Sequence, residues 1–265
     1  MKMKKILIYG LSNMYGGVEA FILNYVNHLP ENKYTVELII MNRTPQYLGE
    51  KLKREVKIHY VPERIKNPLG YNCRVNEIVK KGNYDILWCN FCTLSDITWL
   101  KAAKKYGIPV RIAHIHNYEN MGSKLVLISK LQNKKVISKY VTHFFACSDV
   151  AGKFMFGDNI VKQNNYCLIN NAIETDKYSY NENIRMKTRL DLKISDKIVI
   201  TNVGIFHFQK NHSFLVNVFS EFYKKYPTSV LLLIGDGELM EEVKNQVKKL
   251  GLTDCVMFLG NRGDV

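Results

Sequence analysis

The sequence has no apolar run near the roughly 18 residues that a membrane-spanning helix requires. Its N-terminus, MKMKKILIYGLSNM, places apolar residues after basic ones, but this apolar stretch is shorter than the h-region of a signal peptide. We therefore expect a first buried strand here and a cytoplasmic protein. The apolar share of 46% supports a true hydrophobic core, and 265 residues exceed one ordinary domain.

Cysteine pairs are also scarce. The six cysteines are scattered, and only Cys89 and Cys92 form a C-x-x-C motif. A zinc site of this type would need a second pair, so no metal site is expected. Two alternatives stay open for this motif, a redox pair and reduced thiols at the end of a strand.

The familiar nucleotide-binding motifs are missing as well. The loop YGLSNMYGGVEAF is neither G-x-G-x-x-G nor a P-loop, because no Lys-Ser or Lys-Thr follows its glycines. It does place Gly16 and Gly17 at the start of a predicted helix, where free N–H groups and the helix dipole favour an anion. A simple strand–helix turn is the alternative.

Positive charge, by contrast, is abundant and unevenly distributed. The net charge is +14, and residues 1–175 hold 25 Lys and Arg against 13 Asp and Glu, which is +12. Such a surface suits nucleic acid, an anionic membrane or polyphosphate ligands. Nucleic-acid binding would favour aromatics interleaved with the lysines, and the sequence has no such pattern, so no nucleic-acid partner is expected.

Short β-rich runs alternate with helical patterns along the chain. This alternation predicts an α/β protein with parallel sheets, comprising a Rossmann-like domain at 1–175, a linker at 176–196 and a partial Rossmann-like domain at 197–265. The predicted strands are 4–9, 34–40, 56–61, 84–89, 109–114, 143–147, 166–169, 198–203, 230–234 and 255–259. The predicted helices include 17–29, 73–81, 95–106, 211–226 and 238–250.

Ligands of open α/β sheets bind beyond the carboxyl ends of the strands, so the loops there are the candidate sites. In HIHN, we expect His114 and His116 to point to opposite faces, which argues against a shared metal. His116 would then be available to a substrate, with a structural, hydrogen-bonded histidine as the alternative. In GIFHFQKNH, Lys210 lies at a helix start that Asn211 is expected to cap, which is a good position for a phosphate.

Six segments that occur in one order carry a family resemblance. They are GGVEAFILN, RIAHIHN, FACSDVAGKFMFG, VGIFHFQKNHSFL, LLLIGDGEL and VMFLGNRGDV. Together they resemble the family-four retaining glycosyltransferases of the GT-B fold, most of all bacterial enzymes of capsule or exopolysaccharide assembly. The resemblance implies a nucleotide-sugar donor bound mainly by the second domain, a glycan or lipid-linked acceptor bound mainly by the first, and no required metal or other cofactor.

The resemblance also implies roles for individual residues. Gly16 and Gly17 would face the donor diphosphate and the transferred sugar, and the catalytic His116 would lie near the reacting sugar. Lys210 would contact the diphosphate. Gly204, together with the segment Gly260, Asn261 and Arg262, would line the donor pocket near the base.

Two departures from the family pattern predict impaired turnover. Ile205 occupies a position where family members often carry an arginine. The chain also ends before the EGLP-like loop and the Glu…Glu motif of the family, so we expect a truncated second domain. The alternative is an inactive GT-B-like binding module or a gene fragment, while the missing glycine fingerprint disfavours an NAD-dependent oxidoreductase.

The lysine-rich segment 124–139, KLVLISKLQNKKVISK, leads to a further expectation. As a helix it would place Lys130 with Lys134, and Lys135 with Lys139, at i,i+4 spacing. With the charge of +12 around it, this segment predicts peripheral contact with the inner face of the cell membrane. The alternative is a solvated face of a packed helix.

Overall fold

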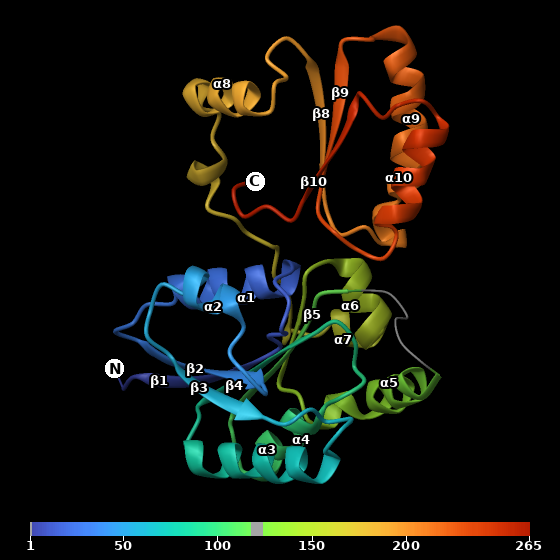
Figure 1. Ribbon diagram of the computed structural model, residues 1–265. Coiled ribbons are helices and arrows are strands. Elements are labelled where there is room, and N and C mark those ends of the chain that lie inside the picture. Colours follow the sequence, from blue (N-terminus) through green and yellow to red (C-terminus); the bar gives the residue numbers. More distant parts are fainter. Residues whose placement is uncertain (1, 118–123) are drawn as a thin grey trace. The chain divides into compact units, whose positions relative to one another are not determined.

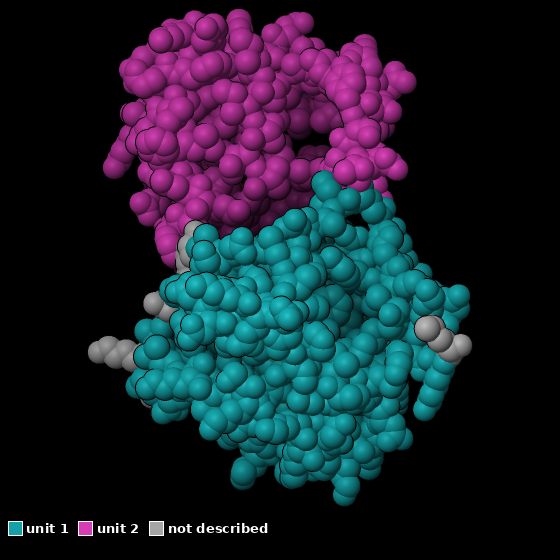
Figure 2. All heavy atoms as spheres, turned by 180° about the vertical axis from the view of Figure 1, so that it is seen from behind, with its two compact units in different colours: residues 1–174 teal, residues 175–265 magenta. Residues whose placement is uncertain are grey.

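The computed structural model describes residues 2–117 and 124–265 and divides the chain into two compact units, Met1–Glu174 and Thr175–Val265 (Figure 1, Figure 2). Each unit contains one parallel sheet with helices against it. The predicted α/β fold with two Rossmann-like units is thereby confirmed. Within the described ranges, no helix has the length and apolar character needed to cross a membrane.

The first unit is built on a seven-stranded sheet in the order β3-β2-β1-β4-β5-β6-β7. Every neighbouring pair in it is parallel. Its strands are β1 (Lys4–Tyr9), β2 (Tyr34–Met41), β3 (Lys57–Val61), β4 (Ile86–Phe91), β5 (Val110–Ile115), β6 (His143–Ala146) and β7 (Tyr166–Leu168). All seven were predicted, within about two residues at each end.

Helices cover both faces of this sheet, which is why its central strands are largely apolar (Figure 1). Leu7 and Leu87 pack on the side of α3 (Pro68–Gly82), α4 (Thr98–Lys105) and α6 (Asp149–Phe156). Ile6 and Ile8 pack on the side of α1 (Gly17–His28) and α2 (Gln46–Lys51). The remaining helical elements of this unit are α5 (Lys124–Val136), η1 (Ile137–Lys139) and α7 (Asp158–Val161).

The second unit has three parallel strands in the order β10-β9-β8. They are β8 (Ile198–Val203), β9 (Ser229–Ile234) and β10 (Val256–Gly260). The helices α9 (His212–Lys225) and α10 (Met240–Lys249) bury an apolar face against one side of the sheet, through residues such as Phe219 and Val243. Figure 1 shows α8 (Glu182–Asp191) on the other side. The short elements are η2 (Thr175–Tyr178) and η3 (Phe208–Lys210).

Candidate active site

The sheet of the first unit has its topological switch point between β1 and β4. The chain continues from β1 to β2 on one side and from β4 to β5 on the other, so the loops after β1 and β4 diverge. A cavity of about 210 Å³ lies there. Its lining residues follow or end the neighbouring strands and are Tyr9, Gly10, Leu11, Ser12, Met41, Asn90, Phe91, Cys92, Thr93, Ser95 and Asp96.

The close approach of two strand ends shapes this cavity. A Cβ on Gly10 would lie 2.7 Å from the carbonyl oxygen of Asn90, so only glycine permits the contact. Asn90 is buried at the end of β4, although it is polar. Neither residue was singled out in the sequence, yet an asparagine at the end of the apolar run ILWCN is a readable signal.

The glycine pair Gly16–Gly17 is exposed at the start of α1. Gly16 is the N-cap residue without a side-chain cap, and a Cβ on Gly17 would meet nothing within 4 Å. The buried Glu19 lies in the first helical turn, and its Oε1 accepts a hydrogen bond from the backbone N–H of Ser12 over 3.0 Å. This helix N-terminus already has a carboxylate beside it, since a Cβ on Gly16 would lie 3.2 Å from Oε2 of Glu19. The charge of Glu19 would repel a second anion at this position.

His114 of β5 and His116, which directly follows this strand, lie on one face, and the expectation that they point apart was wrong. Residues two apart in a strand lie on the same side of a sheet. The ring centroids of His114 and His116 are 4.2 Å apart, and both rings pack edge-on against Phe21 of α1. Even so, no group of three or more His, Cys, Asp or Glu side chains that suits a metal occurs among the residues that the structure describes.

His116 has a defined hydrogen-bonding state. Its Nε2–H donates to Oδ1 of Asn90 over 2.9 Å, because the Nδ2 group of Asn90 is committed to the carbonyl oxygen of Tyr9 at 3.2 Å. Within residues 2–117 and 124–265, Nδ1 of His116 has no hydrogen-bond partner. Burial lowers the pKa of His116 to about 4, so the ring is neutral near pH 7 and Nδ1 can accept a proton.

The C-x-x-C motif consists of free thiols. Cys89 is buried within β4, whereas Cys92 is exposed beyond the end of that strand. Burial raises the pKa of Cys89 well above its usual value and also raises that of Cys92. Both groups are therefore protonated near neutral pH, which is unfavourable for redox chemistry.

In the second unit, glycines lie side by side where the three strands end. The N–H of Gly235 donates to the carbonyl oxygen of Gly260 over 2.8 Å, and a Cβ on Gly235 would lie 2.1 Å from the carbonyl oxygen of Gly204. Gly235 has φ of +137°, which L side chains rarely adopt. This edge of the sheet is therefore lined by glycines, which permit the close packing of its backbone, and Gly235 itself is buried.

Lys210 lies next to this glycine-lined edge. Its Cε lies 3.3 Å from where a Cβ of Gly204 would be, so the aliphatic part of the lysine packs on the glycine. The ammonium group has no ion-pair partner in the part of the chain that the structure describes. Asn211 caps α9 through a hydrogen bond from the N–H of Phe214 at 3.4 Å, as expected. Lys210 therefore presents a positive charge beside a helix N-terminus.

In the segment after β10, the positive charge of Arg262 is paired with a carboxylate, unlike that of Lys210. Nε and Nη2 of Arg262 contact the two carboxylate oxygens of Asp264 at 2.8 and 2.6 Å. Arg262 must leave this exposed pair before it can contact a ligand. Gly260 and Asn261 precede it directly, so the structure groups Gly204, Lys210 and Gly260 at one edge, while Arg262 points to Asp264. The roles assigned to these residues, and to Gly16, Gly17 and His116, stay predictions.

Two consecutive Rossmann-like units with open loops at the carboxyl ends of their strands are the architecture of GT-B glycosyltransferases. Residues 15–177 match the model of Glycosyltransferase Family 4, and residues 185–265 match that of Glycosyl transferases group 1. The chain therefore belongs to glycosyltransferase family 4.

Two curated relatives agree with this assignment. The chain is 27% identical to EpsF of Bacillus subtilis, whose name describes a glycosyltransferase, over 97% of this chain and 68% of EpsF. It is 23% identical to the Escherichia coli UDP-Gal:alpha-D-GlcNAc-diphosphoundecaprenol alpha-1,3-galactosyltransferase, over 98% of this chain and 70% of that enzyme.

Solved structures show the same fold. Anabaena HepE in complex with UDP and glucose aligns with a TM-score of 0.75 at 18% identity, over 98% of this chain and 70% of HepE. A glycosyltransferase from Rickettsia africae aligns with a TM-score of 0.77 at 17% identity, over 100% of this chain and 70% of its own.

Proposed function

We propose that this glycosyltransferase moves a sugar from a nucleotide-sugar donor to a lipid-linked or glycan acceptor in the synthesis of a bacterial surface polysaccharide. The observation that carries the proposal is the free ammonium group of Lys210 beside the glycine-lined edge of the second unit. The names of two similar proteins support it, since HepE was solved with UDP-glucose and the Escherichia coli relative acts on a diphosphoundecaprenol-linked sugar.

In this proposal, Lys210 and the N-terminus of α9 neutralise the nucleoside diphosphate that leaves the sugar. Fixed positive charge of this kind stabilises a leaving group without a metal ion. His116 supplies a neutral imidazole whose Nδ1 can accept a hydrogen bond from a substrate hydroxyl. The cavity beside Asn90, at the switch point of the first unit, is where we propose that the acceptor binds.

We further propose that the rate is reduced by Ile205. This side chain is 53% exposed beside the glycine-lined edge, at the position where an arginine often stands in the family. A second charge-assisted contact to the diphosphate is therefore missing. Introducing Ile205→Arg should raise the transfer rate by about tenfold or more, since such a contact contributes roughly 1.5–3 kcal/mol. An unchanged rate would remove this part of the proposal.

We also propose a peripheral contact of the first unit with an anionic membrane. On α5, Ile128 and Leu131 are exposed, and so is Lys135. Lys139, at the end of η1, is exposed as well. Lys130 is instead buried with its ammonium 4.5 Å from the centre of the Phe154 ring, so it belongs to the packed face. Liposome flotation at low salt should show more binding to anionic than to neutral vesicles, and equal binding would exclude this contact.

The central test is a transfer assay with a panel of UDP-sugars and a lipid-diphosphate-linked acceptor, beside calorimetric titration of UDP and NAD. We expect UDP but not NAD to bind, and product to form with and without EDTA. Binding of UDP without transfer would favour the inactive binding module, and absence of UDP binding would exclude the proposed function. Activity that EDTA abolishes would show that a metal is required after all.

A further inference from the structure

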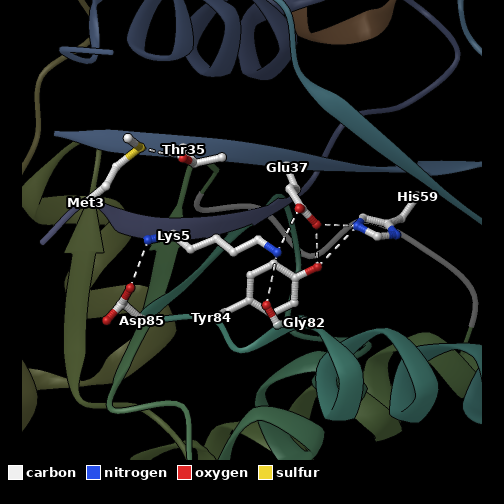
Figure 3. Close-up of polar contacts among 8 residues, drawn as sticks. All are labelled: Met3, Lys5, Thr35, Glu37, His59, Gly82, Tyr84 and Asp85. Atoms are coloured by element: carbon white, nitrogen blue, oxygen red, sulfur yellow. Dashed lines mark hydrogen bonds and ion pairs between the residues drawn. The ribbon is translucent and has the colours of Figure 1, made fainter. Parts of the chain in front are cut away.

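A buried polar cluster lies at the opposite edge of the first sheet from the candidate active site. Lys5, Glu37 and His59 come from the neighbouring strands β1, β2 and β3, and Tyr84 precedes β4 (Figure 3). Lys5 and Tyr84 lie at or before the amino ends of their strands, whereas Asn90 and His116 lie at the carboxyl ends. The cluster is therefore separate from the switch point.

Glu37 is the centre of this cluster. It is 4% exposed, and its Oε1 lies 2.9 Å from the ammonium of Lys5. Its Oε2 accepts hydrogen bonds from Nε2 of His59 at 2.5 Å and from the hydroxyl of Tyr84 at 2.6 Å. Burial opposes ionisation of Glu37, but these three donors outweigh it and lower the pKa to about 2. Glu37 is thus a permanently ionised carboxylate that forms an ion pair with Lys5.

Because Nε2 of His59 is hydrogen-bonded to Glu37, only the other ring nitrogen can contact a ligand. Nδ1 of His59 has no hydrogen-bond partner in residues 2–117 and 124–265. His59 also lines a cavity of about 240 Å³ that adjoins the cluster. The residues that line this cavity with His59 are Lys5, Lys57, Arg74, Glu77, Ile78, Lys81, Gly82 and Tyr84.

The wall of this cavity carries an excess of positive charge. Arg74 and Lys81 share one carboxylate, that of Glu77, at 2.7 and 2.9 Å. Lys57 has no ion-pair partner among the described residues, and Glu37 balances only Lys5. Two positive charges therefore remain unbalanced in a concave surface, where partial exclusion of water strengthens their attraction for an anion.

We propose that this cavity binds the phosphate group of a small molecule or of a lipid headgroup, at a site separate from that of the nucleotide-sugar. Lys57 and Arg74 would contact the phosphate oxygens, and Nδ1 of His59 would accept a hydrogen bond from a hydroxyl of the ligand. The volume lies below the roughly 300–1,000 Å³ of pockets that enclose drug-sized ligands, so it suits a phosphate group with little attached. This site does not depend on the proposed transferase activity.

The test is calorimetric titration of the 265-residue chain with inorganic phosphate and with glycerol 3-phosphate. Saturable binding should weaken at least tenfold in Lys57→Ala and in Arg74→Gln. Lys33→Ala removes an exposed lysine outside the cavity and should leave the affinity unchanged. Lys210→Ala should also leave it unchanged, which separates this site from the donor site in the second unit.

The source of the phosphate can be distinguished with vesicles. If a lipid headgroup is the ligand, flotation with phosphatidic acid vesicles should depend on Lys57 and be competed by glycerol 3-phosphate. If a free small molecule is the ligand, titration should succeed and flotation should not depend on Lys57. Absence of saturable phosphate binding, or an equal loss of affinity in Lys33→Ala, would overturn the proposal and leave the cluster with a purely structural role.

Discussion

Asn90 holds His116 in a single tautomer, with the Nε2–H of His116 directed to Oδ1 of Asn90 at 2.9 Å. Asn90 is the last residue but one of β4, and His116 directly follows the neighbouring strand β5, whose Ile115 pairs with Phe91 of β4. The amide of Asn90 cannot turn without losing its bond to the carbonyl oxygen of Tyr9. The lone pair of His116 is therefore always on Nδ1, which fixes the nitrogen that can meet a substrate.

This relationship predicts the effect of replacing His116. His116→Asn should lower kcat of sugar transfer by about a hundredfold or more, as expected for the loss of a proton-accepting group, with the affinity for UDP unchanged.

Asn90→Asp should shift the acidic limb of the pH–rate profile to higher pH, because a carboxylate raises the pKa of His116 from about 4. A parallel loss of UDP affinity, or a profile that does not move, would contradict the assigned role.

The pair His114 and His116 should make stability depend on pH. Burial lowers the pKa of His114 to about 2 and that of His116 to about 4, so both imidazoles stay neutral in the folded chain down to about pH 4. In the unfolded chain the same two histidines take up protons below about pH 6.5. The free energy of unfolding should therefore fall as the pH drops from 6.5 to 4. Each histidine contributes a slope of up to about 1.4 kcal/mol per pH unit.

His114→Leu tests this dependence. Both ring nitrogens of His114 are buried, with no hydrogen-bond partner in the described part of the chain, so the variant should be more stable at pH 7 by about 1 kcal/mol. It should also show a shallower slope between pH 6.5 and 4. Both tryptophans lie in the first unit, so urea unfolding followed by their fluorescence measures the relevant transition. His143→Leu, at an exposed histidine, is the control, and an equal change there would refute the interpretation.

We expect Lys210 to provide most of the positive charge with which the second unit binds a diphosphate. Lys210→Ala should weaken UDP binding by about tenfold or more, since one charge-assisted hydrogen bond contributes roughly 1.5–3 kcal/mol. The matched control is Lys225→Ala, an exposed lysine at the end of α9, which should bind UDP as the original chain does. Calorimetric titration gives both affinities, and equal values for the two variants would place the diphosphate elsewhere.

Gly235 should tolerate no side chain. In Gly235→Ala, the new Cβ would meet the carbonyl oxygen of Gly204 at 2.1 Å with φ at +137°, so the loop must move. We expect the second unit to lose about 2 kcal/mol or more of stability and UDP binding to weaken. Gly263→Ala, which meets nothing within 4 Å, is the control in the same unit. Hydrogen exchange of β8 and β9 amides should rise only in the first variant, and unchanged exchange there would contradict this account.

The strands could be predicted from the sequence because runs such as ILIY and VLLLI are apolar throughout, which indicates burial on both faces. The site was harder to predict. His114 and His116 were expected on opposite faces, although the period of two places them together. Asn90, which sets the tautomer of His116, lies 26 residues away in sequence, so no local pattern connects the two.

By itself, the sequence determined the alternation of strands and helices, the class of fold, and the loops at which a ligand site is expected. These follow from the periodicity of apolar residues and from the topology of parallel strands. Only the tertiary structure decided which side chains meet. It brought Gly235 against Gly204, left Lys210 free while Arg262 pairs with Asp264, and gathered Lys5, Glu37 and His59 from three strands. Such contacts depend on strand register and loop conformation, which arise from packing between segments that are distant in the chain.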